Sequence, residues 1–516
     1  MRARDSYGLA VLSALMLLLS FPPFDAGYLA WVALVPVLIA IHHERRFGRV
    51  KWLGAAAMAV VFIPQWFEPL RVTAEYWLPA WPASLLALLG GCLVALAWGE
   101  VLALWKPGYL PSARLRFLPA GLWIIVLPVL WTAVEFLALS IPLVMKLGGS
   151  LGYTSLSGTQ WRNVPVVQVA SMTGIYGVTF LILLVNCALA CAITRFREHR
   201  RLHLPAVAAM VLLAGVFAWG RISVPPANSG GISTAVVQAS AAYEEDPDRY
   251  AELVTTSLKY QPRLLIGAAP IDRFADISAE HHTYLLHELE LLSPDGERQH
   301  RDIAYHPFIN IADGFSPWDP QQVFSPPVYP FETQFGRVGS LLSMEGAFPT
   351  PTRRLVENGA QLIATAWVSR GFAWTGLSGG NAVYRAAEFG VPAVAYGLPE
   401  GSIIIDRYGR IMPDAAPQEG IVAASIALGG GRTFYARHGD AFGCVIVLLA
   451  LASIVFNSYL RRKSPFEYCE RCGAKVPKVT QACQQCGAIQ IRPPLWKRFL
   501  LHEYYEHFRR YRKPER

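Results

Sequence analysis

Charged side chains are scarce in this sequence of 516 residues. Asp, Glu, Lys and Arg account for 16% of the chain, hydrophobic residues account for 53%, and the mean hydropathy is +0.31. Because soluble globular domains carry about 25% charged residues, this composition excludes a wholly soluble protein. Much of the chain is therefore expected to lie in lipid.

Apolar runs long enough to cross a bilayer core of about 30 Å occur repeatedly along the chain. The expected spans are residues 6–24, 27–42, 51–68, 82–105, 117–140, 166–193, 203–221 and 441–459. Arg2 and Arg4 precede the first run, which raises the alternative of a signal peptide. That run lacks a small-residue cleavage site and leads directly into the second span, so we expect a polytopic α-helical membrane domain.

Basic residues gather in alternate connections between the expected spans. The clusters lie at residues 2–4, 42–51, 106–117, 195–201 and 461–463. Since positively charged loops stay in the cytoplasm, residues 222–440 are expected outside and residues 461–516 inside. These clusters account for most of the net charge of +9, so nucleic acid is not expected as a partner.

Cysteine is absent from the extracytoplasmic segment, which excludes a disulfide framework there. In the tail, two CxxC pairs lie ten residues apart, and a glycine follows each pair. Four thiolates at this spacing complete a tetrahedral shell, so residues 461–490 are expected to form a structural zinc ribbon that binds Zn²⁺. Its ligands would be Cys469, Cys472, Cys483 and Cys486. The alternative is four unbound, reduced cysteines.

The last residues, 491–516, carry apolar and aromatic side chains at helical spacing with basic residues between them. The apolar positions are Trp496, Leu500, Tyr504, Phe508 and Tyr511. Three interpretations remain open for this tail helix. It packs on the ribbon, lies on anionic lipid, or docks a protein partner.

Residues 226–438 differ from the rest of the chain and predict an α/β domain. β-rich runs at 231–240, 263–269, 284–296, 338–343, 360–367, 392–397 and 401–410 alternate with helical stretches at 246–259, 350–359 and 380–390. The sequences "SPDG" and "DRYGR" predict hairpin turns. At roughly 200 residues, the domain is large enough to bury its own core.

Several segments, in order, resemble one known family. They include "FPPFDAGYLAWVALVPVLIAI" and "LWTAVEFLALSIP" in the membrane part, and "AVVQAS", "GSLLSMEGAFPTPTRRLVENGAQLIATAW" and "YRAAEFGVPAVAYGLPEGSIIIDRYGR" in the outer domain. Over residues 8–440 the chain resembles the bacterial apolipoprotein N-acyltransferases. These membrane enzymes carry a nitrilase-like outer domain and move an acyl chain from phospholipid to the N-terminal cysteine of lipoproteins.

The resemblance implies a domain plan and a location. A seven-span domain at residues 1–225 would precede a nitrilase-like α-β-β-α sandwich of the carbon-nitrogen hydrolase superfamily at 226–438, and an eighth transmembrane helix at 439–460 would follow. The protein would lie in the bacterial cytoplasmic (inner) membrane, with the sandwich in the periplasm and the C-terminus in the cytoplasm. Membrane lipid would be a partner.

The chemistry of this family rests on a Glu–Lys–Cys triad, in which the thiolate attacks an ester, Glu acts as base and acid, and Lys holds the oxyanion. Here the nucleophile position holds Ser343, in a pattern that continues with Glu345. The lysine position holds Asp302, and Arg301 is the nearest cation. The family's Glu ends a strand. In one alignment with the family this strand is missing here, and in the other alignment Ala269 takes the position of the Glu.

Without the base and the lysine, nothing helps Ser343 to lose its proton, so we interpret it as a vestigial nucleophile position. The resemblance implies that Glu345, Arg385 and Glu388 support the pocket. The predicted function is a catalytically degenerate membrane scaffold or complex subunit. Whether its pocket still binds lipid is left open. A protein partner is expected at the ribbon and tail or in the membrane. The alternative is an active phospholipid-dependent acyltransferase or hydrolase that uses Ser343 as a substitute nucleophile, either alone or in a Ser–His–acid triad with His306.

Overall fold

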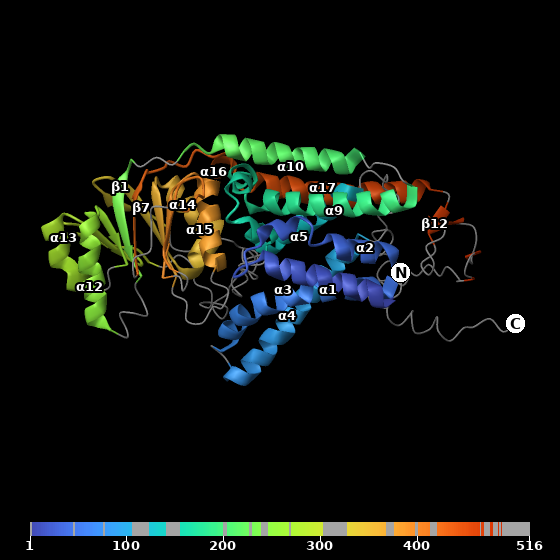
Figure 1. Ribbon diagram of the computed structural model, residues 1–516, viewed down its shortest axis with the longest axis horizontal. Helices are drawn as coiled ribbons and strands as arrows, with labels where there is room; N and C mark the ends of the chain where they lie inside the picture. Colours follow the sequence, from blue (N-terminus) through green and yellow to red (C-terminus); the bar gives the residue numbers. More distant parts are fainter. Residues whose placement is uncertain are drawn as a thin grey trace.

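The computed structural model describes most of the membrane part and most of the outer domain. The described residues are 3–44, 47–75, 78–105, 123–140, 155–199, 204–226, 230–238, 246–267, 270–302, 328–367, 376–397, 401–412, 420–464, 466–468, 475–477, 483–484 and 487. A bundle of long helices forms one part, and a sandwich of two sheets lies at one end of this bundle (Figure 1).

The bundle contains helices of very different lengths. In chain order they are α1 Ala3–Ser20, η1 Gly27–Trp31, α2 Val35–His43, α3 Phe47–Glu75, α4 Ala80–Ala103, α5 Trp123–Ser140, η5 Leu156–Gln160, α7 Val164–Val167, α8 Ala170–Thr173, α9 Ile175–His199, α10 Leu204–Ser223 and α17 Ala441–Lys463. Among the described residues, four stretches are long and apolar enough to cross a bilayer. They are Ala80–Ala103, Ile175–Thr194, Leu204–Ser223 and Ala441–Leu460.

Two predicted spans are interrupted in the structure. The second breaks into η1 and α2, and Pro36 sits in the first turn of α2, where a missing N–H is tolerated. The sixth begins at Ile175 instead of residue 166, because Gly174 takes a left-handed φ of +65° and ends α8. The total of eight spans stays a prediction.

Small and polar residues hold the bundle together. A Cβ atom on Gly54 of α3 would lie 2.6 Å from the carbonyl oxygen of Gly99 on α4, so only glycine permits this approach. Asn186 of α9 accepts a hydrogen bond from the N–H of Leu34 at 2.8 Å and donates one to the oxygen of Ala30 at 2.9 Å. The broken second segment is thereby fixed to α9 through its backbone.

Two sheets lie face to face in the outer domain. The first has the order β11-β1-β2-β3-β4-β5, from Ile421–Ile426, Ile232–Val237, Leu264–Ile266, Tyr284–His287, Glu290–Leu292 and Arg298–His300. The second has the order β10-β9-β8-β7-β6, from Ile403–Ile405, Ala393–Tyr396, Leu362–Ala366, Gly336–Leu342 and Phe331–Thr333. Strands β1, β2 and β3 are parallel, as are β7, β8 and β9. The predicted hairpin turns are confirmed, since Ser293 N–H donates to Glu297 O and Asp406 N–H donates to Arg410 O, both at 2.9 Å.

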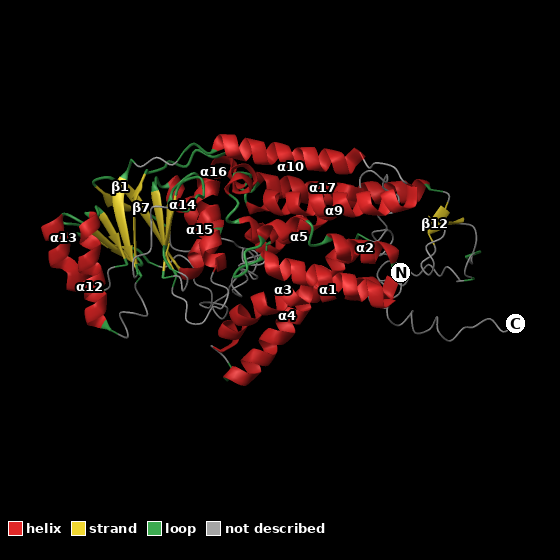
Figure 2. Ribbon diagram, viewed as in Figure 1, coloured by secondary structure: helices red, strands yellow, loops and turns green. Residues whose placement is uncertain are grey.

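Alternation along the strands builds this sandwich. In β1, Val236 faces the core between the sheets, whereas Ala235 and Val237 face Tyr250 and other residues of the outer helices. The outer helix layer contains α12 Pro247–Ser257, η6 Leu258–Tyr260, η7 Ile271–Phe274 and α13 Ala275–His281. The layer beside the bundle contains α14 Pro349–Glu357, α15 Gly376–Phe389 and α16 Phe434–His438. The resulting order is helix, sheet, sheet, helix, membrane bundle (Figure 2).

Hydrogen bonds attach the sandwich to the bundle. The hydroxyl of Tyr384 on α15 donates to the carbonyl oxygen of Ser157 at 2.6 Å. Gln168, which follows α7, donates its amide N–H to the oxygen of Tyr408 at 2.6 Å. Both contacts lie between residues more than 200 positions apart in the sequence, so they fix the position of one part relative to the other.

Candidate active site

The predicted nucleophile position lies at the carboxyl end of a central parallel strand. Strand β7 ends at Leu342, and residues Ser343–Ala347 form the 3-10 helix η9. A Cβ atom on Gly346 would lie 2.5 Å from Thr365 Cγ2 of β8, so the turn needs glycine there. The backbone therefore turns sharply at residue 343, while the side chain of Ser343 lies outside the described residues.

Glu345 and Arg301 form a buried ion pair beside this turn. Arg301 Nη2 lies 2.5 Å from Glu345 Oε2, and Nη1 lies 3.4 Å from Oε1. Glu345 is fully buried and Arg301 is 6% exposed. Glu345 Oε2 also accepts a hydrogen bond from the N–H of Leu342 at 2.9 Å, so this carboxylate caps the turn that carries residue 343.

The ion pair joins the two sheets. Arg301 follows β5 of the first sheet, and its N–H donates to the oxygen of Leu289 at 3.0 Å. Glu345 follows β7 of the second sheet. The sequence pointed to Arg301 only as the cation nearest to the family's lysine position, and the contact with Glu345 was not predicted.

The other two triad positions are placed less completely. Among the described residues, β2 is the first strand after β1 and pairs with it in parallel, and Ala269, the position of the family's Glu in the second alignment, comes three residues after β2 ends. Ala269 itself lies outside the described residues. Asp302 is described, and its side chain is 78% exposed and lies 3.7 Å from His300 Nε2. His306 also lies outside the described residues.

Another polar group lies at the end of β3. Glu288, with φ +48°, donates its backbone N–H to the hydroxyl of Tyr396 at 2.7 Å. Its backbone carbonyl oxygen accepts a hydrogen bond from the hydroxyl of Ser340. These contacts tie the β3–β4 turn to the second sheet. Burial lowers the pKa of the neighbouring His287, whose Nε2 lies 3.8 Å from Glu288 Oε1. Burial therefore favours the neutral form of His287.

Arg385 and Glu388 form a second buried ion pair, at the junction with the bundle. Arg385 Nη2 lies 2.8 Å from Glu388 Oε2, and both side chains are at most 4% exposed. Glu388 Oε1 accepts a hydrogen bond from the N–H of Ile175 at 3.0 Å, at the amino end of α9. Burial raises the pKa of Glu388 to about 7 against the opposing effect of Arg385. These residues were predicted to support the pocket, and the contacts described place them in the attachment to the membrane part.

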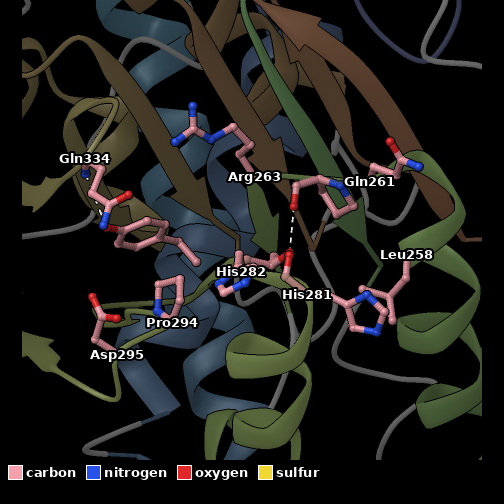
Figure 3. Close-up of a pocket in the computed structure, with 11 residues that line it drawn as sticks. Leu258, Gln261, Arg263, His281, His282, Pro294, Asp295 and Gln334 are labelled. Carbon is pink, nitrogen blue, oxygen red and sulfur yellow. Dashed lines mark hydrogen bonds between the residues drawn. The ribbon is translucent and has the colours of Figure 1, made fainter.

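A pocket of about 350 Å³ lies at the opposite edge of the sandwich. Figure 3 shows Arg263, His281, His282 and Gln334 around it. Arg263 directly precedes β2 and Gln334 precedes β7, so the pocket is at the amino ends of the parallel strands. It is therefore separate from the turn at residue 343.

The described part of the cysteine-rich tail forms a small hairpin. Strands β12 Phe466–Tyr468 and β13 Lys475–Pro477 are antiparallel, with Tyr468 opposite Lys475. Beyond them, the N–H of Gly487 donates to the oxygen of Cys483 at 2.8 Å, and Gly487 has φ +67°. Cys469, Cys472 and Cys486 lie outside the described residues, and no group of three metal-binding side chains is found among the residues that are described.

Family models and relatives cover both parts of the chain. The apolipoprotein N-acyltransferase N-terminal domain matches residues 13–188, and the carbon-nitrogen hydrolase domain matches residues 222–435. The apolipoprotein N-acyltransferase of Geobacter metallireducens is 29% identical over 89% of this chain and 96% of its own length. That of Thermotoga maritima is 24% identical over 89% of this chain and 95% of its own length. The chain belongs to the apolipoprotein N-acyltransferase family.

As a member of the apolipoprotein N-acyltransferase family, the chain is a membrane protein with a nitrilase-like domain. Among solved structures, a mutant amidase of the nitrilase superfamily from Nesterenkonia AN1 is 17% identical and covers 38% of this chain and 92% of the amidase. Its TM-score is 0.30.

Proposed function

We propose that this chain is a catalytically degenerate apolipoprotein N-acyltransferase relative that works as a membrane scaffold or complex subunit in contact with lipid. The observation that carries the proposal is the buried pair of Arg301 and Glu345. It occupies the edge of the sandwich where acyl transfer would need a free base and a cation aimed at the oxyanion.

The pair does not supply either function. An arginine stays protonated in proteins, so Arg301 cannot shuttle a proton. Two of its nitrogens are directed to Glu345, and one of them also donates to the oxygen of Asp302 at 2.9 Å. Glu345 is occupied by this cation and by the turn that it caps. Asp302, at the position of the family's lysine, would repel a developing oxyanion.

Complementation tests the loss of catalysis. In cells depleted of their apolipoprotein N-acyltransferase, neither this chain nor its Ser343→Cys variant should restore growth or acylate the N-terminal cysteine of a lipoprotein, as read by mass spectrometry. One restored triad member should recover little because such residues act as a unit. The Geobacter metallireducens relative is the positive control. A covalent acyl adduct on Ser343 that disappears in Ser343→Ala would overturn the proposal in favour of a serine-dependent acyltransferase or hydrolase.

We also propose that residues 461–490 form a structural zinc ribbon on the cytoplasmic side that provides a contact for a protein partner. The register of β12 and β13 leaves residues 469–474, with two of the cysteines, between the strands. The turn from Cys483 to Gly487 spans the second pair. Cys469, Cys472, Cys483 and Cys486 would hold the ion, and Zn²⁺ would supply folding energy to this segment.

Metal analysis tests the ribbon. The full chain, purified without chelators, should contain one zinc ion per chain, and the double variant Cys469→Ser/Cys483→Ser should lose it while the bundle stays folded. Cys92→Ser/Cys444→Ser is the matched control, because these cysteines lie in membrane helices. Zinc absent from the unmodified chain, or retained by the double variant, would contradict the assignment.

A further inference from the structure

We propose that a pocket where the sandwich meets the bundle binds the phosphate of an anionic phospholipid headgroup. The pocket has a volume of about 330 Å³ and lies between the end of α10 and the hairpin at residues 406–410. It is at the amino end of β9, because Ile405 of β10 pairs with Ala393. It is therefore separate from the edge at residue 343, and the proposal does not rest on whether Ser343 is active.

Hydrogen bonds close the hairpin and attach it to the membrane part. Asp406 accepts hydrogen bonds from the N–H groups of Tyr408 and Arg410 at 2.9 and 3.0 Å. Gln168 donates to the oxygen of Tyr408, and a Cβ atom on Gly409 would lie 3.0 Å from Val167 Cγ1. The tip of the hairpin is thus held against the segment that leads into α9.

Of the two arginines that line the pocket, only Arg410 makes an ion pair with a residue that the structure describes. Arg410 donates from Nε and Nη2 to Asp406 Oδ2 at 2.9 and 2.7 Å, and from Nη1 to the oxygen of Pro225 at 3.2 Å. Arg407 is exposed and makes no ion pair with the residues that the structure describes; its guanidinium carbon lies 5.2 Å from the ring centre of Tyr408. A planar guanidinium beside a phenol suits the oxygens of a phosphate group.

The pocket lies where a lipid headgroup would be. Pro225 and Pro226, which line it, come just after α10, which ends at Ser223. On that helix Trp219 is 39% exposed and Ile222 is 84% exposed, as expected of side chains that face lipid. Figure 1 shows α10 running along the bundle and ending beside the sandwich. A phospholipid lying along this helix would place its phosphate at Arg407.

Native mass spectrometry of the full chain in detergent tests the proposal, with phosphatidylglycerol and phosphatidylcholine of identical acyl chains as probes. Arg407→Gln should weaken the binding of phosphatidylglycerol roughly fivefold, the effect of one basic residue at an anionic membrane surface. Arg407→Lys should retain most of the binding. Arg249→Gln is the charge-matched control, because Arg249 is exposed on α12 in the outermost layer. Equal binding by Arg407→Gln and Arg249→Gln would overturn the proposal.

Two further arms identify the source of the phosphate and the position of the site. Soluble glycerol phosphate should not compete with the lipid. Competition at similar concentrations would show that the ligand of the pocket is a soluble phosphate and not a lipid. Photoreactive p-benzoylphenylalanine in place of Tyr408 should crosslink to phosphatidylglycerol in nanodiscs, whereas the same replacement at Tyr260, beyond the first sheet, should not. Absence of a lipid adduct at position 408 would refute the location.

Discussion

Removing one partner of the Arg301–Glu345 pair should strongly destabilise the edge of the sandwich. Glu345 is fully buried and Arg301 is 6% exposed, so water cannot replace the lost partner. Breaking a buried ion pair costs about 3–5 kcal/mol, because the remaining charge stays uncompensated. Arg301→Met and Glu345→Gln should therefore each lower the local free energy of opening by about 3 kcal/mol or more.

The double variant Arg301→Met/Glu345→Gln should cost only about 1 kcal/mol, because no net charge stays buried. Glutamine keeps an oxygen that accepts from the N–H of Leu342, and methionine fills the space of the arginine stem. Because the two residues are in contact, the free energy lost in the two single variants together should far exceed the free energy lost in the double variant. Such a difference is the signature of a coupled pair.

Hydrogen exchange of the full chain, followed by mass spectrometry of peptides that cover residues 336–348, measures this local opening. A loss of about 3 kcal/mol should accelerate exchange roughly 150-fold. Arg298→Met is the control, because its ion pair with Asp272 joins side chains that are 53% and 72% exposed, and such pairs contribute less than about 1 kcal/mol. If Arg301→Met accelerates exchange no more than Arg298→Met, the assignment of this pair as a stabilising link between the sheets is wrong.

Three further predictions concern other parts of the molecule. Since basic loops stay inside, a cysteine placed at position 300 should react with an impermeant maleimide from the outer side. A cysteine placed at position 464 should react only after permeabilisation, and the reverse pattern would contradict the predicted topology. Ser343→Ala should leave the cellular phenotype unchanged, and a loss of function would indicate an active serine. Burial raises the pKa of Glu388 from 4.5 to about 7, so the folded state binds a proton more tightly than the unfolded state. The free energy of unfolding should therefore increase by up to about 3 kcal/mol as the pH is lowered from 8 to 4. Glu388→Gln should reduce this pH dependence, and an unchanged profile in thermal unfolding would refute it.

The sequence predicted the elements that depend on local patterns. Alternating strands, the hairpins at "SPDG" and "DRYGR", and the strand end before Ser343 follow from periodicity and turn chemistry, and the structure contains them. The helix boundaries were predicted less well where a single residue decides them. Gly174 ends a short helix inside an apolar run, and a hydropathy pattern does not register that break.

Long-range pairing could not be read from the chain. Arg301 and Glu345 are 44 positions apart and lie in different sheets, so only the packing of the sandwich brings them together. Glu388 and Ile175 are 213 positions apart and lie in different parts of the molecule. The resemblance to the family marked Glu345 and Glu388 as supports, but their partners required the structure.

The attachment of the sandwich to the bundle is compatible with the proposed scaffold function. Burying Glu388 is unfavourable, and its contacts with Arg385 and the N–H of Ile175 offset that cost only in one arrangement of the two parts. Tyr384 and Gln168 add direct hydrogen bonds to the same arrangement. None of these contacts needs a nucleophile at position 343. If the chain has lost acyl transfer, as we propose, these contacts still hold the sandwich in one position beside the bundle, and the proposed scaffold requires such a fixed position.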